Sequence, residues 1–295
     1  MRGQSSLSSY PPDTPSVDMS SLLVGFDSAW TPGNRGAIAA ALRHDDGTFV
    51  EVGDPEPVDF REATGVIRRW QEDHVPASTL ILLDQPTVVA NASGQRPVEN
   101  LACGCVSARR GGMQPAFTGR VAMFGADAPV WAFLSAFGGA ADPLVPLDGC
   151  AVLETYPVLA MIALGWLRDD TRSCGRLPKY NPGRRKTFSI EDWQFVCDQA
   201  AASLRARGLH GLGEWIEGKR ELERPRKVDQ DQLDACLCLL VAVQLAAGED
   251  GLMVGNQTTG YIVVPHSTSL AEELATRCEA TSRIVCDWVK PFRLC

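Results

Sequence analysis

Acidic side chains stand directly beside apolar segments at four places in the chain. Asp27 follows LLVGF, Asp84 follows LILL and Glu154 follows AVL, while Asp231 and Asp234 open a long apolar segment. A buried carboxylate is costly unless a cation or a metal ion compensates its charge. Carboxylates gathered at one edge of a sheet are the donors that a divalent-metal site needs. These five residues are therefore the candidate catalytic and metal-binding residues.

Each acid also has a structural explanation. Asp84 lies two residues before Pro86 and suits a turn or a helix cap. Asp231 and Asp234 suit a helix N-terminus, where a negative charge complements the helix dipole. Three residues apart, they also share one helical face and can point at one site. Glu154 is the hardest of the five acids to explain as a turn residue. Taken together, the five acids favour a shared site more strongly than any one of them does alone. The sequence leaves open whether Asp231 or Asp234 is the ligand.

The elements that must position these acids follow from the hydrophobic pattern. Short apolar runs predict strands at 21–27, 78–84, 150–154 and 260–265, and Asp46-Gly47 predicts a hairpin within 36–53. Apolar residues at helical spacing predict helices at 59–74, 128–138, 158–167, 190–208, 229–248 and 269–280. This order indicates an α/β protein with a mixed sheet covered by helices.

Three stretches depart from this pattern. Residues 87–127 and 168–188 are rich in Gly, Pro and Arg and predict irregular insertions, and loops of this length in a compact domain are usually functional or mobile. Residues 1–18 are rich in Ser and Pro and predict a disordered leader, or an upstream start before Met19. We expect a single domain over 19–295.

Composition excludes several classes of protein. The chain has 28 basic and 36 acidic residues, a net charge of -8, which disfavours nucleic-acid binding over the whole surface but permits a local basic groove. We find no membrane-spanning run and no signal peptide, so we expect a cytoplasmic protein with no membrane partner. The ten cysteines suit reduced thiols better than zinc, because Cys103 and Cys105 are spaced too closely for common zinc motifs.

The sequence resembles a known family, the bacterial domain of unknown function 429, described as predicted RNase H-like nucleases. The matching motifs are GFDSAW (25–30), LLDQP (82–86), RPVEN (96–100), ETYP (154–157), KYNP (179–182) and DQLDA (231–235), in family order across roughly residues 20–265. The resemblance implies an RNase H-like mixed β-sheet flanked by helices. It places a metal-binding Asp27 on the first strand, Asp84 on the adjacent strand and Asp231 or Asp234 on a later helix. Glu154, which ends the fifth strand, is distinctive of the family.

The function that the resemblance implies is a metal-dependent nuclease that hydrolyses phosphodiester bonds by a two-metal carboxylate mechanism. Two Mg²⁺ or Mn²⁺ ions, roughly 4 Å apart, would be bridged by Asp27, and no nucleophilic side chain is required. An oxygen-only ligand set favours these ions over zinc. Nucleic acid is the expected partner. The expected phosphate-binding residues are Arg96, Arg109, Arg110, Lys179, Arg226 and Lys227.

Two other classes of protein are alternatives. A non-catalytic nucleic-acid or metal-binding module of the same fold would bind without turnover. An actin-like or sugar-kinase-like phosphotransferase shares the core fold, and its first strand also ends in Asp. It needs Gly-rich phosphate loops after two strands, whereas only Gly33 and Gly36 follow the first strand here. For the basic residues, a solvated surface is the structural alternative.

Overall fold

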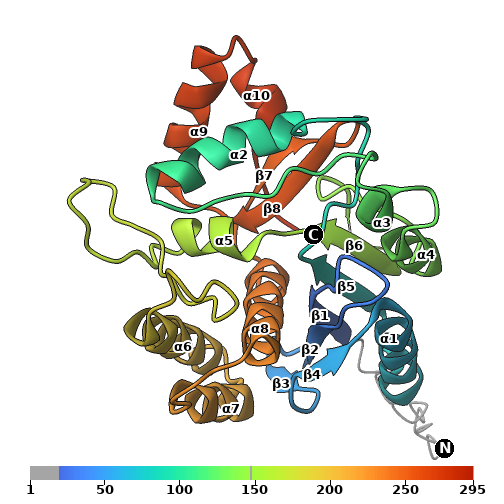
Figure 1. Cartoon of the computed structure of the whole chain (residues 1–295). Helices are drawn as coiled ribbons and strands as arrows, with labels where there is room; N and C mark the ends of the chain where they lie inside the picture. Colours follow the sequence, from blue (N-terminus) through green and yellow to red (C-terminus); the bar gives the residue numbers. More distant parts are fainter. Residues whose placement is uncertain (1–19, 147, 295) are drawn as a thin grey trace, which may run out of the picture.

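Two β-sheets surrounded by helices make up the computed structural model, which describes residues 20–146 and 148–294 (Figure 1). The larger sheet consists of β1 (Ser21–Asp27), β2 (Gly36–Arg43), β3 (Phe49–Glu51), β4 (Glu56–Val58), β5 (Ser78–Leu83) and β6 (Cys150–Glu154). Its order is β3-β2-β1-β5-β6, with β4 paired to β2. Strands β1, β5 and β6 run parallel, and β2 is antiparallel to β1, β3 and β4. The predicted mixed α/β sheet is confirmed.

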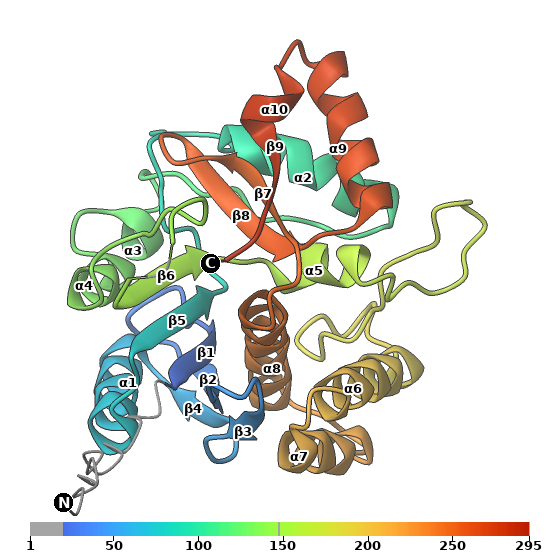
Figure 2. The ribbon, with the colours of Figure 1, turned by 180° about the vertical axis from the view of Figure 1, so that it is seen from behind.

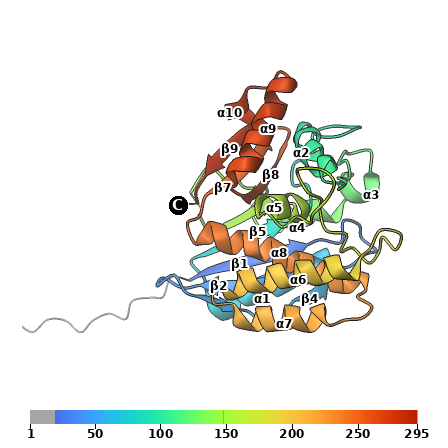
Figure 3. The same cartoon turned by 90° about the vertical axis from the view of Figure 1, so that its left-hand side faces the viewer.

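Helices cover both faces of the larger sheet. One face packs against α1 (Phe60–His74) and α4 (Pro129–Ala136). The other packs against α8 (Lys227–Ala246), beside which lie α6 (Ile190–Arg205) and α7 (His210–Arg220) (Figures 1 and 3). Side chains alternate along β1, so that Val24 and Phe26 face α1 while Leu23 belongs to the core around α8. Asp27 therefore falls on the α8 face.

A second, three-stranded sheet lies above the first in the view from behind (Figure 2). It consists of β7 (Gly251–Asn256), β8 (Gly260–Pro265) and β9 (Val289–Phe292) in the order β8-β7-β9. Its helices are α2 (Pro97–Ala108), α9 (Thr268–Ala280) and α10 (Val285–Trp288), and α5 (Pro157–Ala163) follows β6 towards α8. A bridge between Thr155 and Val263 connects the end of β6 to β8. Of these strands, the sequence predicted only β8.

The sequence predicts an irregular insertion over 87–127, but part of this stretch is helical. It contains the twelve-residue helix α2 and the short helix α3 (Val121–Phe124). The sequence of α2, PVENLACGCVSA, has many small residues, so its helical periodicity is weak. Its start is nevertheless marked by Pro97 at the first helical position and by Glu99, which accepts a hydrogen bond from the Arg96 amide at 3.0 Å. The stretch 168–188 contains no named helix or strand.

Two other local predictions, the hairpin within 36–53 and the helix at 59–74, are confirmed. The hairpin joins β2 to β3 through Gly47, whose φ of 84° lies in the left-handed region. Helix α1 begins with a capping box between Asp59 and Glu62. All nine cysteines among the described residues are free thiols. The predicted leader, 1–18, lies outside the described residues. None of the helices in the described part of the chain is long and apolar enough to cross a bilayer.

Candidate active site

Strand register brings two of the predicted acids to the same edge and the same face of the larger sheet. Phe26 pairs with Leu83 across the parallel strands β1 and β5, so Asp27 and Asp84 come next on both strands. The Asp84 amide donates to the Phe26 carbonyl at 2.8 Å. The segments that follow are also joined, because the Trp30 indole N–H donates to the Asp84 carbonyl at 3.1 Å. The carboxylates of Asp27 and Asp84 both face α8.

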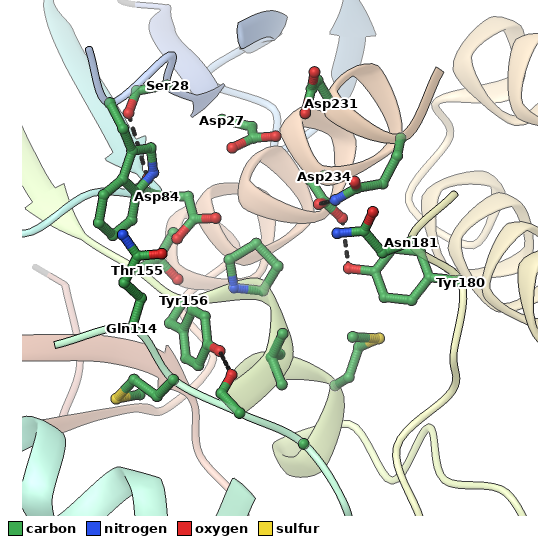
Figure 4. Close-up of a pocket in the computed structure, with 18 of the residues that line it drawn as sticks. Asp27, Ser28, Asp84, Gln114, Thr155, Tyr156, Tyr180, Asn181, Asp231 and Asp234 are labelled. Carbon is green, nitrogen blue, oxygen red and sulfur yellow. Dashed lines mark hydrogen bonds between the residues drawn. The ribbon is translucent and has the colours of Figure 1, made fainter. Parts of the chain in front are cut away.

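Helix α8 supplies the third carboxylate of this face. It crosses β1 so closely that a Cβ on Gly25 would lie 2.2 Å from both the Ala235 carbonyl oxygen and the Leu239 amide nitrogen. The glycine of GFDSAW therefore permits the helix to approach. Asp234, in the second turn of α8, points towards Asp27 and Asp84 (Figure 4).

The three aspartates form an undercompensated cluster of negative charge. Burial raises the pKa of Asp27 well above its ordinary value, and repulsion by Asp234 and Asp84 raises it further. Burial and repulsion by Asp234 also raise the pKa of Asp84. Burial raises the pKa of Asp234 to about 6, although Lys227 and the hydroxyl of Tyr180 oppose that shift. Such a cluster holds protons unless a cation enters.

Asp231 has a different environment from Asp234. It forms an ion pair with Lys227, one turn earlier on α8, whose side chain is about half exposed. Asp234 instead accepts hydrogen bonds from Tyr180, at 2.7 Å, and from Gln230. Burial disfavours the charge of Lys227, but Asp27, Asp231 and Asp234 outweigh it and raise the pKa of the lysine. Lys227 is thus the cation that partly neutralises the cluster.

Glu154 lines the same cavity and its charge raises the pKa of Asp84, but its own contacts differ from those of the three aspartates. It pairs in register with Leu83 rather than with Asp84, so it falls on the opposite face of the sheet. Both of its oxygens bind the guanidinium of Arg96, at 2.6 and 2.8 Å, and Oε2 also accepts the Thr87 amide at 3.0 Å. Arg96 also pairs with Glu99 at 2.8 Å. Burial raises the pKa of Glu154, while Arg96 opposes the shift and favours the ionised form.

All five predicted acids line one cavity, with a volume of about 750 Å³. Of the predicted basic residues, Arg96, Arg110, Lys179 and Lys227 also line it, whereas Arg109 and Arg226 are not among its lining residues. Arg109 pairs with Glu273 at 2.9 Å and Arg226 with Asp229 at 3.5 Å. The cavity therefore collects every predicted acid but only part of the predicted basic set.

The carboxylate oxygens that a metal ion would need are present in the cavity, but they are not already arranged around an ion. Among the described residues, no group of three or more His, Cys, Asp or Glu side chains is placed to hold a metal. Asp27, Asp84 and Asp234 are nevertheless close enough to raise one another's pKa values. Their oxygens and their excess charge fit a divalent cation better than a soft metal.

Sequence reasoning missed two residues with clear roles in the cavity. The ring of Tyr180 is buried in the core, and its hydroxyl donates to the Asp234 carboxylate and orients it. Gln230 binds the other oxygen of that carboxylate. The signal for Gln230 was its position one helical turn before Asp234. The signal for Tyr180 was only its presence in KYNP.

The fold and the cavity define a class: an α/β protein with an acidic cavity at the carboxyl edge of three parallel strands. The sequence model of one family, proteins of unknown function (DUF429), matches residues 25–259. The chain belongs to this family, and the match includes every acid of the cavity. It has no significant match among curated proteins or among solved structures.

Proposed function

We propose that this protein is an RNase H-like, metal-dependent phosphodiesterase that acts on nucleic acid. The observation that carries the proposal is the cluster of Asp27, Asp84 and Asp234. The buried Asp27 and Asp234 and the half-buried Asp84 share one cavity, and Lys227 only partly offsets their charge, so the cluster calls for a further cation. Support for the RNase H-like assignment comes from Asp27 and Asp84 on adjacent parallel strands and from Asp234 on a later helix.

Asp27, Asp84 and Asp234 would hold the Mg²⁺ or Mn²⁺ ions. Two such ions, when bound, supply a water molecule of lowered pKa and stabilise charge on the leaving oxygen. Hydrolysis adds the hydroxyl of water to phosphorus and returns a proton to the leaving alkoxide. Tyr180 donates to Oδ1 of Asp234 and Gln230 donates to Oδ2, and hydrogen bonds of this kind orient a carboxylate that would hold a metal ion.

Asp231 and Glu154 have other roles in this proposal. Asp231 holds Lys227 beside the cluster through an ion pair. Glu154 holds Arg96 and, through its Oε2, the Thr87 backbone, so it shapes the segment after β5. Both residues are expected to position the ligands, because a cation already pairs with each of them, Lys227 with Asp231 and Arg96 with Glu154.

A non-catalytic binding module is the second candidate. One observation favours it: two of the five acids, Asp231 and Glu154, are already paired with cations, so fewer carboxylates remain to hold two metal ions. In such a module the same cavity would bind metal and phosphate without turnover. Hydrolysis itself therefore separates the two candidates.

The test is hydrolysis of bis(p-nitrophenyl) phosphate and of single-stranded oligonucleotides with Mn²⁺ or Mg²⁺. The wild-type protein is expected to release product. Asp84→Asn is expected to reduce the rate by at least about 100-fold, because loss of a group that only hydrogen-bonds a metal ligand already lowers activity by up to about 100-fold. The control is Asp73→Asn, an exposed acid on α1 at the opposite face. A folded wild-type protein that binds Mn²⁺ but hydrolyses neither substrate would favour the binding module.

A further inference from the structure

The cavity has a second wall, chemically unlike the acidic one. Two segments form it, residues 110–114 and residues 177–184. Hydrogen bonds join them: the Leu177 amide donates to the Arg109 carbonyl at 2.9 Å, and Lys179 Nζ donates to the Arg110 carbonyl. The Tyr156 hydroxyl donates to the Gly112 carbonyl at 2.8 Å (Figure 4). The wall is therefore fixed to the end of β6.

A buried carboxylate anchors the second of these segments. Asp192, which is 1% exposed, accepts the Lys179 amide at 2.6 Å. It also pairs with Arg176 at 2.5 Å and with Arg168 at 3.3 Å. The irregular segment is thus held at several points, and the side chains that it presents to the cavity have defined places.

This wall presents cations that have no carboxylate partner. Arg184 lines the cavity, and its side chain makes no hydrogen bond or ion pair with the described residues. Burial lowers the pKa of Lys179, and the neighbouring charges of Arg176 and Arg184 lower it further. By contrast, the cavity's Arg110 is already paired with Asp170 at 2.8 Å. An anion beside Arg184 and Lys179 would relieve this excess of positive charge.

The size of the cavity limits what the two walls can enclose. A volume of about 750 Å³ lies within the range of small-ligand pockets, roughly 300–1,000 Å³. Proteins that bind a DNA duplex instead bury roughly 1,000–2,500 Å² of surface. Several basic residues outside the cavity are already paired: Arg109 with Glu273, Lys219 with Asp229, and Arg220 with Asp198. These pairs reduce the positive charge that is available to a longer backbone.

We infer that the cavity takes one phosphorylated nucleotide unit at a time, with the phosphate between the aspartates and the cations Arg184 and Lys179. The unit is either a free nucleotide ester or the last nucleotide of a single strand. Trp30 also lines the cavity and offers an aromatic surface to a base. This inference rests on the proposed function and narrows its substrate to chain ends and small esters.

Binding tests the phosphate wall without relying on turnover. Titration of a nucleoside 5′-monophosphate into the Mn²⁺-loaded protein is expected to show binding that Arg184→Ala weakens about tenfold or more, because charge-assisted hydrogen bonds are lost. The control is Arg185→Ala, the next residue, which is exposed and not among the cavity's lining residues. Equal affinities for the two variants would overturn the inference.

Substrate topology tests the restriction to ends. Linear single strands are expected to shorten from a terminus and the p-nitrophenyl ester of thymidine 5′-monophosphate to be hydrolysed, while closed circular single strands and duplexes stay intact. Cleavage of the circles at a rate similar to the linear strand would overturn the inference but support the proposed nuclease. Mononucleotide binding that depends on Arg184, without hydrolysis of any substrate, would support the inferred site and overturn the proposed hydrolysis.

Discussion

At the scale of single residues, the cavity separates acids that look equivalent in the sequence. Asp231 and Asp234 lie three residues apart on α8, yet Asp231 pairs with Lys227 while Asp234 is turned towards Asp27 and Asp84. The distinction comes from the partners of each carboxylate. The pKa of Asp234 is raised to about 6, because the charge around it is only partly compensated. Asp231 instead forms an ion pair with Lys227.

This distinction predicts unequal effects of the two amide substitutions. Asp234→Asn is expected to weaken Mn²⁺ binding by at least about tenfold more than Asp231→Asn, because Asp234 acts more strongly on Asp27 and Asp84 and Asp231 is paired with Lys227. Isothermal titration calorimetry measures both affinities. Asp229→Asn, on the same helix but paired with Lys219 outside the cavity, is the control. The assignment fails should Asp231→Asn prove the more damaging change.

The raised pKa of Asp234 also predicts a pH dependence of stability. Because its pKa rises from 3.8 to about 6 on folding, the folded state binds more protons than the unfolded state between these values. The free energy of unfolding of the metal-free protein should therefore fall as pH rises from about 4 to 6 through this group. Urea denaturation at pH 4, 5, 6 and 7 measures it, with Asp234→Asn as reference. A wild-type curve that runs parallel to the variant's would contradict the assigned shift.

The same protons compete with metal. Mn²⁺ affinity should rise as pH increases through about 6, with proton release on binding, since the carboxylates must ionise to bind. Calorimetry in two buffers of different ionisation enthalpy measures the released protons. Affinity that is constant between pH 5 and 7 would mean that these carboxylates are not the ligands.

At the scale of elements, the site depends on how closely α8 crosses β1. A Cβ on Gly25 would meet backbone atoms of α8 at 2.2 Å, and backbone cannot rotate away as a side chain can. Gly25→Ala is expected to lower the free energy of unfolding by about 1–3 kcal/mol or more, and to displace Asp234. Urea denaturation measures the change. Gly33→Ala is the control, because nothing lies within 4 Å of a Cβ there; equal stability of both variants would contradict the close approach.

Much of this arrangement could be predicted from the sequence. Apolar runs that end in Asp27 and Asp84 predicted the two strands and the acidic edge, and the apolar stretch after Asp229 predicted α8. The place of Glu154 could not be predicted, because its face depends on the register with β5, which no local pattern encodes. Helix α2 was missed because its many small residues weaken the helical periodicity. Strands β7 and β9 were missed because neither shows a distinctive strand pattern in the sequence.

At the scale of the whole molecule, a buried ion-pair network connects the two sheets. Arg96 precedes α2, which packs beside the second sheet, and its partner Glu154 ends β6 of the larger sheet. Arg96 and Glu154 are 1% and 2% exposed, so neither charge can be solvated if its partner is lost. The network also includes Glu99, which accepts the Ala116 amide at 3.0 Å.

Arg96→Met is therefore expected to destabilise the protein by about 3–5 kcal/mol, because it leaves Glu99 and Glu154 buried without a cation. Thermal or urea denaturation measures the loss. Arg35→Met is the comparison: its pair with Glu62 is largely exposed and should contribute less than about 1 kcal/mol. Similar losses in the two variants would show that the network does not hold the sheets together.

Titration with Mn²⁺ by calorimetry decides whether Asp27 belongs to a divalent-metal centre. Wild-type protein and Asp73→Asn are expected to bind Mn²⁺, and Asp27→Asn to lose binding while it still unfolds cooperatively. The titration is repeated with a nucleoside 5′-monophosphate, so that a phosphate can complete the site. Undiminished binding by Asp27→Asn, or no binding by the wild type under either condition, would show that Asp27 does not belong to a metal centre.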